Sequence, residues 1–234
     1  MSDLSTAVMA RRRDPASALD LYPTPPWATR ALVEEVLVPE GLVSGGHAGT
    51  SSAYDPCCGQ GHMAIPLAEY FASVRASDVH DWGYGERRDL DFTMASAEVI
   101  GRPDWVIANP PFALADRFVD RALTIARDGV SMLLRLQWLE GGERYQTIFS
   151  GTRKPALVCP FAERVPMIEG CWDPEASSAT AYAWFVWDCR ASAPARSSIL
   201  HIRPGMAQLY HRPQDEALAV RGEARRRAAA RKAA

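Results

Sequence analysis

The stretch AYDPCCGQG at residues 53–61 decides the fold expected for this chain of 234 residues. It begins as a short strand and ends in a glycine turn, and the apolar spacing of residues 64–71 then indicates a helix. Strand, glycine turn and helix form the first half of a nucleotide-binding βαβ unit. A lone GxG is weak evidence and lacks the full dinucleotide spacing. Asp55 adds a carboxylate at the strand end that can hold a cationic amine.

Two further acidic positions fit the same interpretation. A second expected strand, residues 73–78, ends in Asp78, about twenty residues beyond the glycines, where a carboxylate can meet ribose hydroxyls. Asp91 stands beside Phe92, and an acid next to an aromatic ring could hold an adenine by amine contact and ring packing. Each of these acids could instead cap a helix or a turn.

A second informative segment follows the apolar run at residues 105–108. Asn109 precedes a proline and is therefore expected to be extended, and Pro110 and Pro111 make a stiff corner without N–H groups. The Asn109 side-chain oxygen and the Pro110 carbonyl can accept the two hydrogens of an exocyclic amine, and Phe112 can stack on the ring that bears it. Taken alone, the tetrapeptide could equally be a simple turn.

Strands and helices alternate along the rest of the chain. Helices are expected at residues 24–37, 64–71, 113–127 and 143–149, and strands at 53–55, 73–78, 105–108, 129–139, 155–165, 181–187 and 199–202. This order predicts an open, mainly parallel α/β sheet, with antiparallel pairing among the last strands because no long helix separates them. Thr24 is expected to cap the first helix, with Pro25 or Pro26 in its first turn.

Composition narrows the class of protein. The formal net charge is −2, 47% of residues are hydrophobic, and no apolar run is long enough to span a bilayer. The N-terminus lacks the apolar core of a signal peptide, so a cytoplasmic protein with no membrane partner is expected. The five cysteines have an odd number and irregular spacing that match neither a disulfide framework nor a zinc site, so no metal is expected.

Three segments divide the chain. Residues 1–19 are expected to be a mobile N-terminus, 20–205 the folded domain, and 206–234 a basic C-terminal tail. The tail carries Arg225, Arg226 and Arg227 and then Arg231 and Lys232 in an alanine-rich background. It is either a basic helix or a disordered tail, and it is either solvated or in contact with phosphates.

Three motifs stand in a particular order: YPTPP at residues 22–26, DPCCGQG at 55–61 and NPPF at 109–112. They resemble motifs X, I and the catalytic motif IV of the S-adenosylmethionine-dependent DNA N6-adenine methyltransferases, in the order of the gamma group. The phrases GHMA (61–64), LLRLQWLEG (133–141) and YAWFVW (182–187) are similar to those of short phage and prophage enzymes of this kind. The resemblance covers roughly residues 20–205.

The resemblance implies a Rossmann-like class I methyltransferase sheet of seven strands, mainly parallel, with the seventh antiparallel. It implies S-adenosylmethionine as cofactor and DNA as partner, and it identifies residues 166–180 as a short insertion facing the target. That insertion is too short for a separate target-recognition domain, so strong sequence specificity is not expected from this chain alone. The implied cofactor-binding residues are Tyr22, Thr24, Pro25, Asp55, Pro56, Cys57, Gly59 and Gly61 at the methionine end, Asp78 at the ribose, and Asp91 and Phe92 at the adenine. The implied catalytic residues are Asn109, Pro110, Pro111 and Phe112.

Several alternatives remain open on the sequence. The same tetrapeptide serves RNA adenine and protein glutamine methyltransferases, and a noncatalytic nucleic-acid binder could retain the fold. The sequence does not indicate the recognised DNA site, and a homodimer is possible. No strong general base is required for amine methylation, and His62 is better explained as a helix-start or packing residue.

Overall fold

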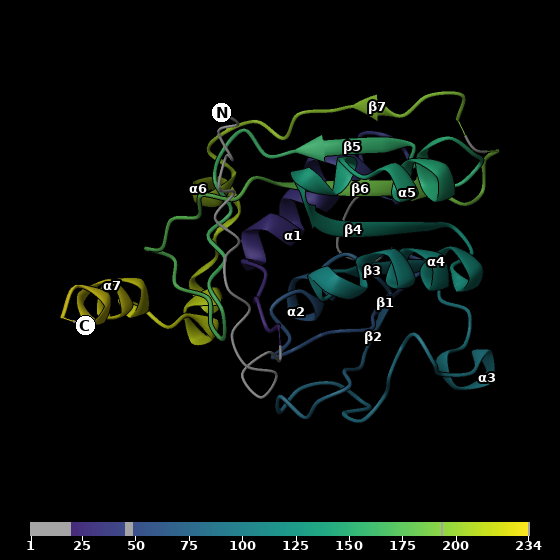
Figure 1. Ribbon diagram of the computed structural model, residues 1–234. Helices are drawn as coiled ribbons and strands as arrows, with labels where there is room; N and C mark the ends of the chain where they lie inside the picture. Colours follow the sequence, from purple (N-terminus) through teal and green to yellow (C-terminus); the bar gives the residue numbers. More distant parts are fainter. Residues whose placement is uncertain (1–19, 45–48, 193, 234) are drawn as a thin grey trace, which may run out of the picture.

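The computed structural model describes residues 20–44, 49–192 and 194–233 (Figure 1). The N-terminal segment 1–19, expected to be mobile, lies outside the described residues. The described part is built on a seven-stranded sheet in the order β2-β1-β3-β4-β6-β5-β7. Among its helices, none is both long and apolar enough to cross a membrane.

The strands confirm the fold class. They are β1 Ser52–Asp55, β2 Ser73–Ala76, β3 Trp105–Ala108, β4 Gly129–Arg135, β5 Leu157–Pro160, β6 Tyr182–Asp188 and β7 Ser198–Ile199. β6 runs antiparallel to both β4 and β5, while every other strand pair in the sheet is parallel. The expectation that the seventh strand is antiparallel is wrong in its numbering, because the antiparallel strand is sixth along the chain. The seventh, β7, is a two-residue edge strand parallel to β5.

The helices follow the expected order but are shorter. They are α1 Pro26–Leu32, which continues as a π-helical turn Val33–Leu37, then α2 Ala64–Leu67, α3 Ala97–Ile100, α4 Ala115–Ile125, α5 Gly142–Arg144, α6 Met206–Tyr210 and α7 Glu223–Ala233. Shorter helical turns are Phe112–Leu114, Leu136–Leu139, Tyr145–Phe149 and Pro213–Leu218. The expected cap at Thr24 is wrong. The N-cap of α1 is Pro25, which is extended because Pro26 follows it and which has no side-chain oxygen to accept a hydrogen bond.

Each face of the sheet carries its own apolar layer. Side chains alternate along a strand, so Trp105 and Ile107 of β3 lie on one face with α1, while Val106 and Ala108 lie on the other with α4. All four residues of β3 are buried. The central strand that ends at the Asn-Pro-Pro corner is therefore fixed from both sides.

The segment after residue 205 belongs partly to the folded domain. The fully buried guanidinium of Arg30 on α1 forms two hydrogen bonds to Asp215, at 2.7 and 2.8 Å, and a third to the Tyr210 carbonyl at 2.8 Å. It also binds the Glu69 carboxylate at 2.7 Å. Residues 206–218, which contain α6 and a further helical turn, are thus held against α1, and the cluster of basic residues expected in the tail lies on α7.

Candidate functional site

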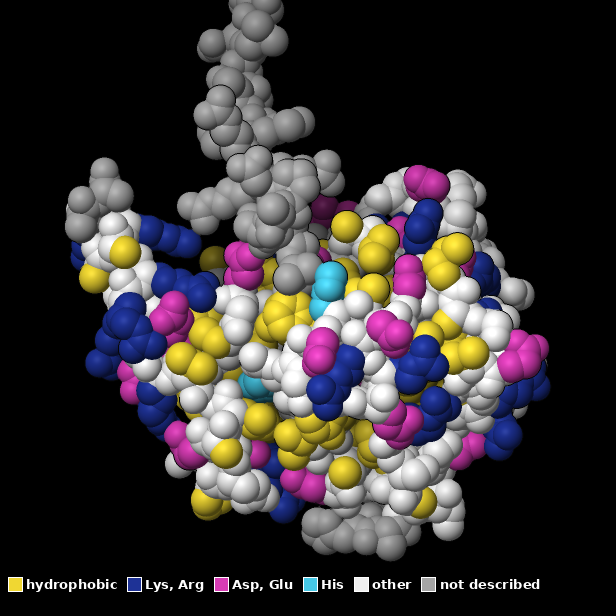
Figure 2. Space-filling model, turned by 90° about the horizontal axis from the view of Figure 1, so that it is seen from below, with side chains coloured by type: hydrophobic (Ala, Val, Ile, Leu, Met, Phe, Trp, Pro, Cys, Tyr) yellow, Lys and Arg dark blue, Asp and Glu magenta, His cyan; other side chains and the backbone are white. Residues whose placement is uncertain are grey.

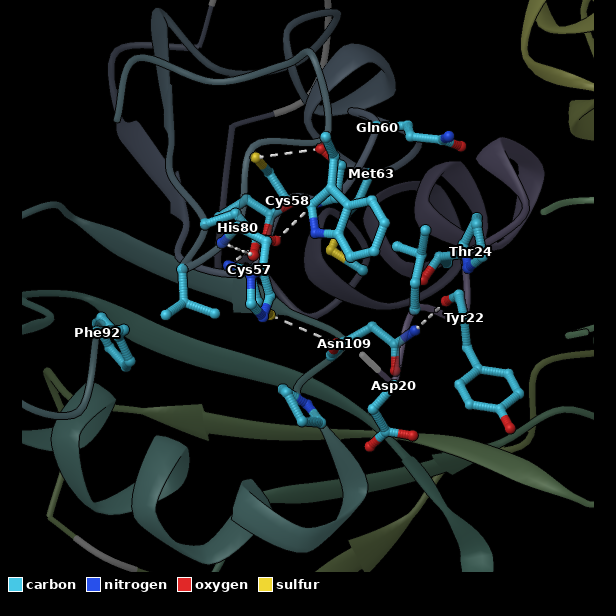
Figure 3. A pocket seen from close by; sticks show the side chains of 18 of the residues that line it. Asp20, Tyr22, Thr24, Cys57, Cys58, Gln60, Met63, His80, Phe92 and Asn109 are labelled. Carbon is cyan, nitrogen blue, oxygen red and sulfur yellow. Dashed lines mark hydrogen bonds between the residues drawn. The ribbon is translucent and has the colours of Figure 1, made fainter. Parts of the chain in front are cut away.

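A cavity of about 250 Å³ opens at the carboxyl ends of β1, β2 and β3 (Figure 3). The chain leaves β1 toward β2 on one side, while β3 pairs with β1 on the other, so this is the topological switch point where open α/β sheets bind ligands. The wall is formed by the segment before α1, the glycine turn after β1, the loop after β2, residues 90–92 and the corner after β3.

Most residues singled out from the sequence line this cavity. They are Tyr22, Thr24, Asp55, Cys57, Gly59, Asp78, Asp91, Phe92, Asn109 and Pro111. Five others do not line it: Pro25, Pro56, Gly61, Pro110 and Phe112. Lining residues that the sequence did not single out are Asp20, Leu21, Pro23, Cys58, Gln60, His62, Met63, Val79, His80, Trp82, Leu90, Leu114 and Phe118. Most of these are direct neighbours of a motif, but His80 and Trp82 carry no motif signal and depend on how the loop after β2 folds.

The glycine turn requires glycine for conformational and steric reasons. Gly59 and Gly61 have φ angles of +51° and +87°, in the region that side chains disfavour. A Cβ on Gly61 would lie 2.7 Å from the Tyr84 ring. The Gly59 N–H donates to one Asp78 oxygen at 2.9 Å, and the other accepts from the His80 N–H at 3.0 Å. Asp78 thus joins two loops of the wall and stabilises a turn, so both of its sequence interpretations are compatible with its position.

Asp91 and Phe92, the residues expected at the adenine, have different surroundings. Asp91 is exposed and lines the cavity. Its carboxylate accepts hydrogen bonds from the N–H and hydroxyl of Thr93 and so closes a local turn. Phe92 is 1% exposed and packs on Tyr54 and Phe118, with ring centroids 5.9 and 5.1 Å away. Phe92 is therefore a core residue that also lines the cavity.

The Asp55 carboxyl is buried with few hydrogen bonds to replace its contacts with water. Asp55 is 1% exposed, and among the described residues its carboxyl accepts one hydrogen bond, from the Cys57 N–H at 3.3 Å. Burial raises the pKa of Asp55 to about 8; the Cys57 N–H lowers it, and the nearby Asp78 charge raises it further. A cationic amine in the cavity would supply the missing positive charge.

Asn109 is held by two other parts of the wall. Its Nδ2 donates to the Tyr22 carbonyl at 2.8 Å, and the Cys57 thiol donates to the Asn109 carbonyl at 3.4 Å, as the dashed lines in Figure 3 show. Because a carbonyl oxygen only accepts hydrogen bonds, and only the NH2 end of an asparagine amide can donate one, the first contact fixes which way the amide faces. The Oδ1 atom of Asn109 is buried and has no hydrogen-bond partner among the described residues. The corner thus presents an unused acceptor beside the glycine turn.

Phe112 is positioned differently from the expectation that it stacks on a target ring. Its N–H donates to Asp20 at 2.8 Å, and its ring does not line the cavity. The ring lies against Tyr22, at 5.2 Å between centroids, while the Arg135 guanidinium carbon lies 3.7 Å from its centroid. Arg135, at the end of β4, therefore covers one face of the Phe112 ring, and no local sequence pattern predicts this contact.

His62 lines the cavity, but its ring is held by residues from the C-terminal part of the chain. Its Nε2 donates to the Leu218 carbonyl at 3.0 Å, and its ring meets the edge of Trp172 at 6.4 Å between centroids. Burial lowers the pKa of His62, with the Leu218 carbonyl acting in the opposite direction. A neutral imidazole with Nε2 protonated fits the packing role expected for it.

Comparisons with known proteins identify the fold of the chain. No family model matches the chain, and no curated protein matches its sequence. Solved structures do match. A putative RNA methyltransferase from Pyrococcus horikoshii is 16% identical with a TM-score of 0.51, over 75% of this chain and 90% of that one. A putative class I S-adenosylmethionine-dependent methyltransferase from Listeria monocytogenes is 13% identical with a TM-score of 0.51, over 83% of this chain and 68% of that one. The chain therefore has the class I methyltransferase fold.

Proposed function

We propose that this chain transfers the methyl group of S-adenosylmethionine to the exocyclic N6 amine of adenine in DNA. One observation carries the proposal: the buried, unpartnered Oδ1 of Asn109, fixed in orientation by Tyr22, beside a glycine-turn cavity. An amine with two hydrogens requires acceptors, and this corner offers one that nothing else in the described structure uses.

The cavity residues fit the cofactor chemically. Asp55 is a buried carboxyl in need of a cation, and the methionine end of S-adenosylmethionine carries an ammonium group. Asp78 lies at the end of the second strand, where a carboxylate can accept ribose hydroxyls. Phe92 offers an aromatic ring to a purine. When bound, the cofactor would supply an electrophilic methyl group.

The protein would act mainly by holding the acceptor amine. The N6 lone pair of adenine is conjugated with the ring, so the free amine is a poor nucleophile. Acceptance of its two hydrogens by Asn109 Oδ1 and the Pro110 carbonyl would hold the nitrogen closer to tetrahedral, with its lone pair turned toward the cavity. Such positioning can contribute several kcal/mol to lowering the barrier. No general base is needed, because the proton can leave after the methyl is attached.

A base inside a duplex must first leave the stack, at a cost of about a few kcal/mol. The aromatic side chains of Tyr22 and Phe112 lie beside the corner and are suited to receive it. Since Arg135 covers one face of Phe112, we infer that an entering base either displaces this guanidinium or stacks on its outer side. Stacking of either kind contributes on the order of 1–3 kcal/mol per base.

The test is methyl transfer from labelled S-adenosylmethionine by the wild type and by Asn109→Ala. The variant should bind the cofactor normally in calorimetry but lose transfer to unmethylated DNA by about 100-fold or more, the scale seen when one positioned hydrogen-bonding group is removed. Gln146→Ala removes an exposed side-chain amide outside the cavity and is the matched control. Full activity of Asn109→Ala would refute the mechanism.

The alternatives give different outcomes in the same experiment. Transfer to ribosomal RNA or to a release factor, with none to DNA, would identify another nitrogen acceptor for the same site. Absence of cofactor binding by the wild-type protein would favour a noncatalytic nucleic-acid binder with this fold.

A further inference from the structure

The C-terminal helix α7 concentrates the positive charge of the protein. Its eleven residues contain five basic side chains and one acid, Glu223, and the other five are alanines. The charge of α7 is thus +4, so the rest of the chain carries −6 of the overall −2. The helix has no large apolar side chain to bury, and hydrophobic packing cannot be the reason for its position.

The first turn of α7 is nevertheless anchored firmly. Asp173, fully buried, accepts the Ala224 N–H at 2.9 Å, and the neighbouring Trp172 carbonyl accepts the Val220 N–H at 2.8 Å. Burial raises the pKa of Asp173, but backbone N–H groups around the helix start lower it by more, so the net direction is downward. An ionised, buried carboxylate at a helix start both caps the helix and complements its dipole.

The anchor places α7 next to residue 170, which contacts the cavity wall. The N–H of Gly170 donates to the carbonyl of Leu21, which lines the cavity, at 2.7 Å. A Cβ built on Gly170 would in turn lie 4.0 Å from an Nη atom of Arg227 on α7. Figure 1 shows α7 standing out from the body on the side where α1 and α2 lie, and Figure 2 shows Lys and Arg side chains gathered at that edge.

The outer basic residues of α7 are free to exchange partners. Arg226 and Arg227 pair with Glu223 on the same helix, at 2.9 and 2.7 Å. Arg225 is 81% exposed and pairs with Glu175 at 2.9 Å, and exposed pairs of this kind are weak. Within the described part of the chain, Arg231 and Lys232 have no ion pair. Three cations on an anchored, outward-pointing helix are available to a polyanion.

We propose that α7 is an arm that binds the DNA backbone flanking the target base, with Arg225, Arg231 and Lys232 as phosphate contacts. The inference rests on the proposed function for its choice of DNA. Charge complementarity favours this occupant, because a duplex carries closely spaced phosphates and an otherwise acidic body would repel it. Phosphate contacts position a protein on a duplex without reading its sequence, so this arm would contribute affinity and register rather than specificity.

The experiment compares two triple variants with equal loss of charge. The test variant is Arg225→Gln/Arg231→Gln/Lys232→Gln, in which glutamine preserves helix propensity. The control is Arg102→Gln/Arg190→Gln/Arg196→Gln, three exposed arginines before β3, after β6 and before β7, which lie at the strand ends opposite to those that form the cavity. Fluorescence anisotropy with a labelled duplex of about twenty base pairs is measured at several salt concentrations, together with DNA methylation.

The slope of log affinity against log salt should fall by about 2–3 in the α7 variant, since each phosphate contact contributes about 0.9. At 0.15 M salt this corresponds to an affinity loss on the order of 100-fold. The control should keep the wild-type slope. Methylation by the α7 variant should show a raised KM for DNA and an unchanged kcat, and circular dichroism should show that the helix content is retained.

Other outcomes would overturn the inference in distinguishable ways. If wild type methylates DNA and the α7 variant keeps its salt slope, α7 is not the arm while the proposed function stands. If both triple variants lose the same slope, the effect is one of net charge and α7 has no special role. If wild type neither binds nor methylates DNA, the proposed function and the inference fall together.

Discussion

Asp55 ends β1 with its carboxyl in the cavity, 1% exposed and with a pKa of about 8 against an ordinary 3.8. Because the folded protein holds this proton more tightly than the unfolded chain does, the free energy of unfolding without cofactor decreases as pH rises from about 4 to about 8. Each pKa unit corresponds to about 1.4 kcal/mol, so the full cost of ionising Asp55 has an upper bound of about 6 kcal/mol. Asp55→Asn cannot ionise, so this variant should lack that slope and should be the more stable protein at pH 8.

The same carboxyl should make cofactor affinity depend on pH. Binding of an ammonium group needs Asp55 ionised, which holds for about 1% of molecules at pH 6 and for about half at pH 8. The cofactor's α-amino group is itself roughly half protonated near pH 8. The product of the two factors predicts affinity on the order of 20-fold higher at pH 8 than at pH 6, with a decline again at higher pH.

Isothermal titration with S-adenosylmethionine across this range measures the effect, with proton release obtained from buffers of different ionisation enthalpy. Asp55→Asn should bind more weakly at pH 8 and should change by less than about threefold between pH 6 and 8, because only the ligand still titrates. Equal wild-type affinities at pH 6 and 8, or an unchanged pH dependence in Asp55→Asn, would show that Asp55 does not hold the ammonium.

Two further predictions concern the frame around the cavity. Arg30→Met leaves the Asp215 carboxylate buried without its cation, so urea unfolding should show a loss of about 3–5 kcal/mol, and a loss below about 1 kcal/mol would contradict the buried pair. Gly61→Ala places a side chain at φ +87° and 2.7 Å from the Tyr84 ring, so it should cost at least about 1–3 kcal/mol. The matched Gly142→Ala, where a Cβ would meet nothing within 4 Å, should be near neutral in the same assay.

The parts of the site that sequence predicted share one property. Asp55 is the last residue of a strand, Asp78 and Asn109 follow strands within two residues, and the carboxyl ends of parallel strands lie at the same end of a sheet. Their proximity therefore follows from hydrophobic runs and chain order, which are local signals. The antiparallel pairing of β5 and β6 was predictable for a similar reason, since the connection between them lacks a long helix.

The parts that could not be predicted depend on contacts between distant segments. The pairing of Arg30 with Asp215 joins residues 185 positions apart, and no local pattern distinguishes it from two surface charges. The sequence alone therefore predicts a tail from residue 206, whereas the structure packs residues 206–218 against α1. The orientation of Phe112 depends on Arg135, which stands at the end of an apolar strand and gave no sign that its guanidinium would cover a ring.

The orientation of the Asn109 amide depends on the segment at Tyr22, which carries the first of the three motifs. An asparagine side chain presents an acceptor or a donor to the same space depending on a half-turn of its amide, and the tetrapeptide itself does not select between them. A donor facing an amine would oppose the amine's own hydrogens. The Tyr22 carbonyl, 87 residues away in the chain, takes the Nδ2 hydrogen and leaves Oδ1 without a hydrogen-bond partner among the described residues. The segment before α1 therefore determines that Asn109 offers an acceptor and not a donor. Without that segment, the Asn-Pro-Pro corner would be a turn with no fixed amide orientation.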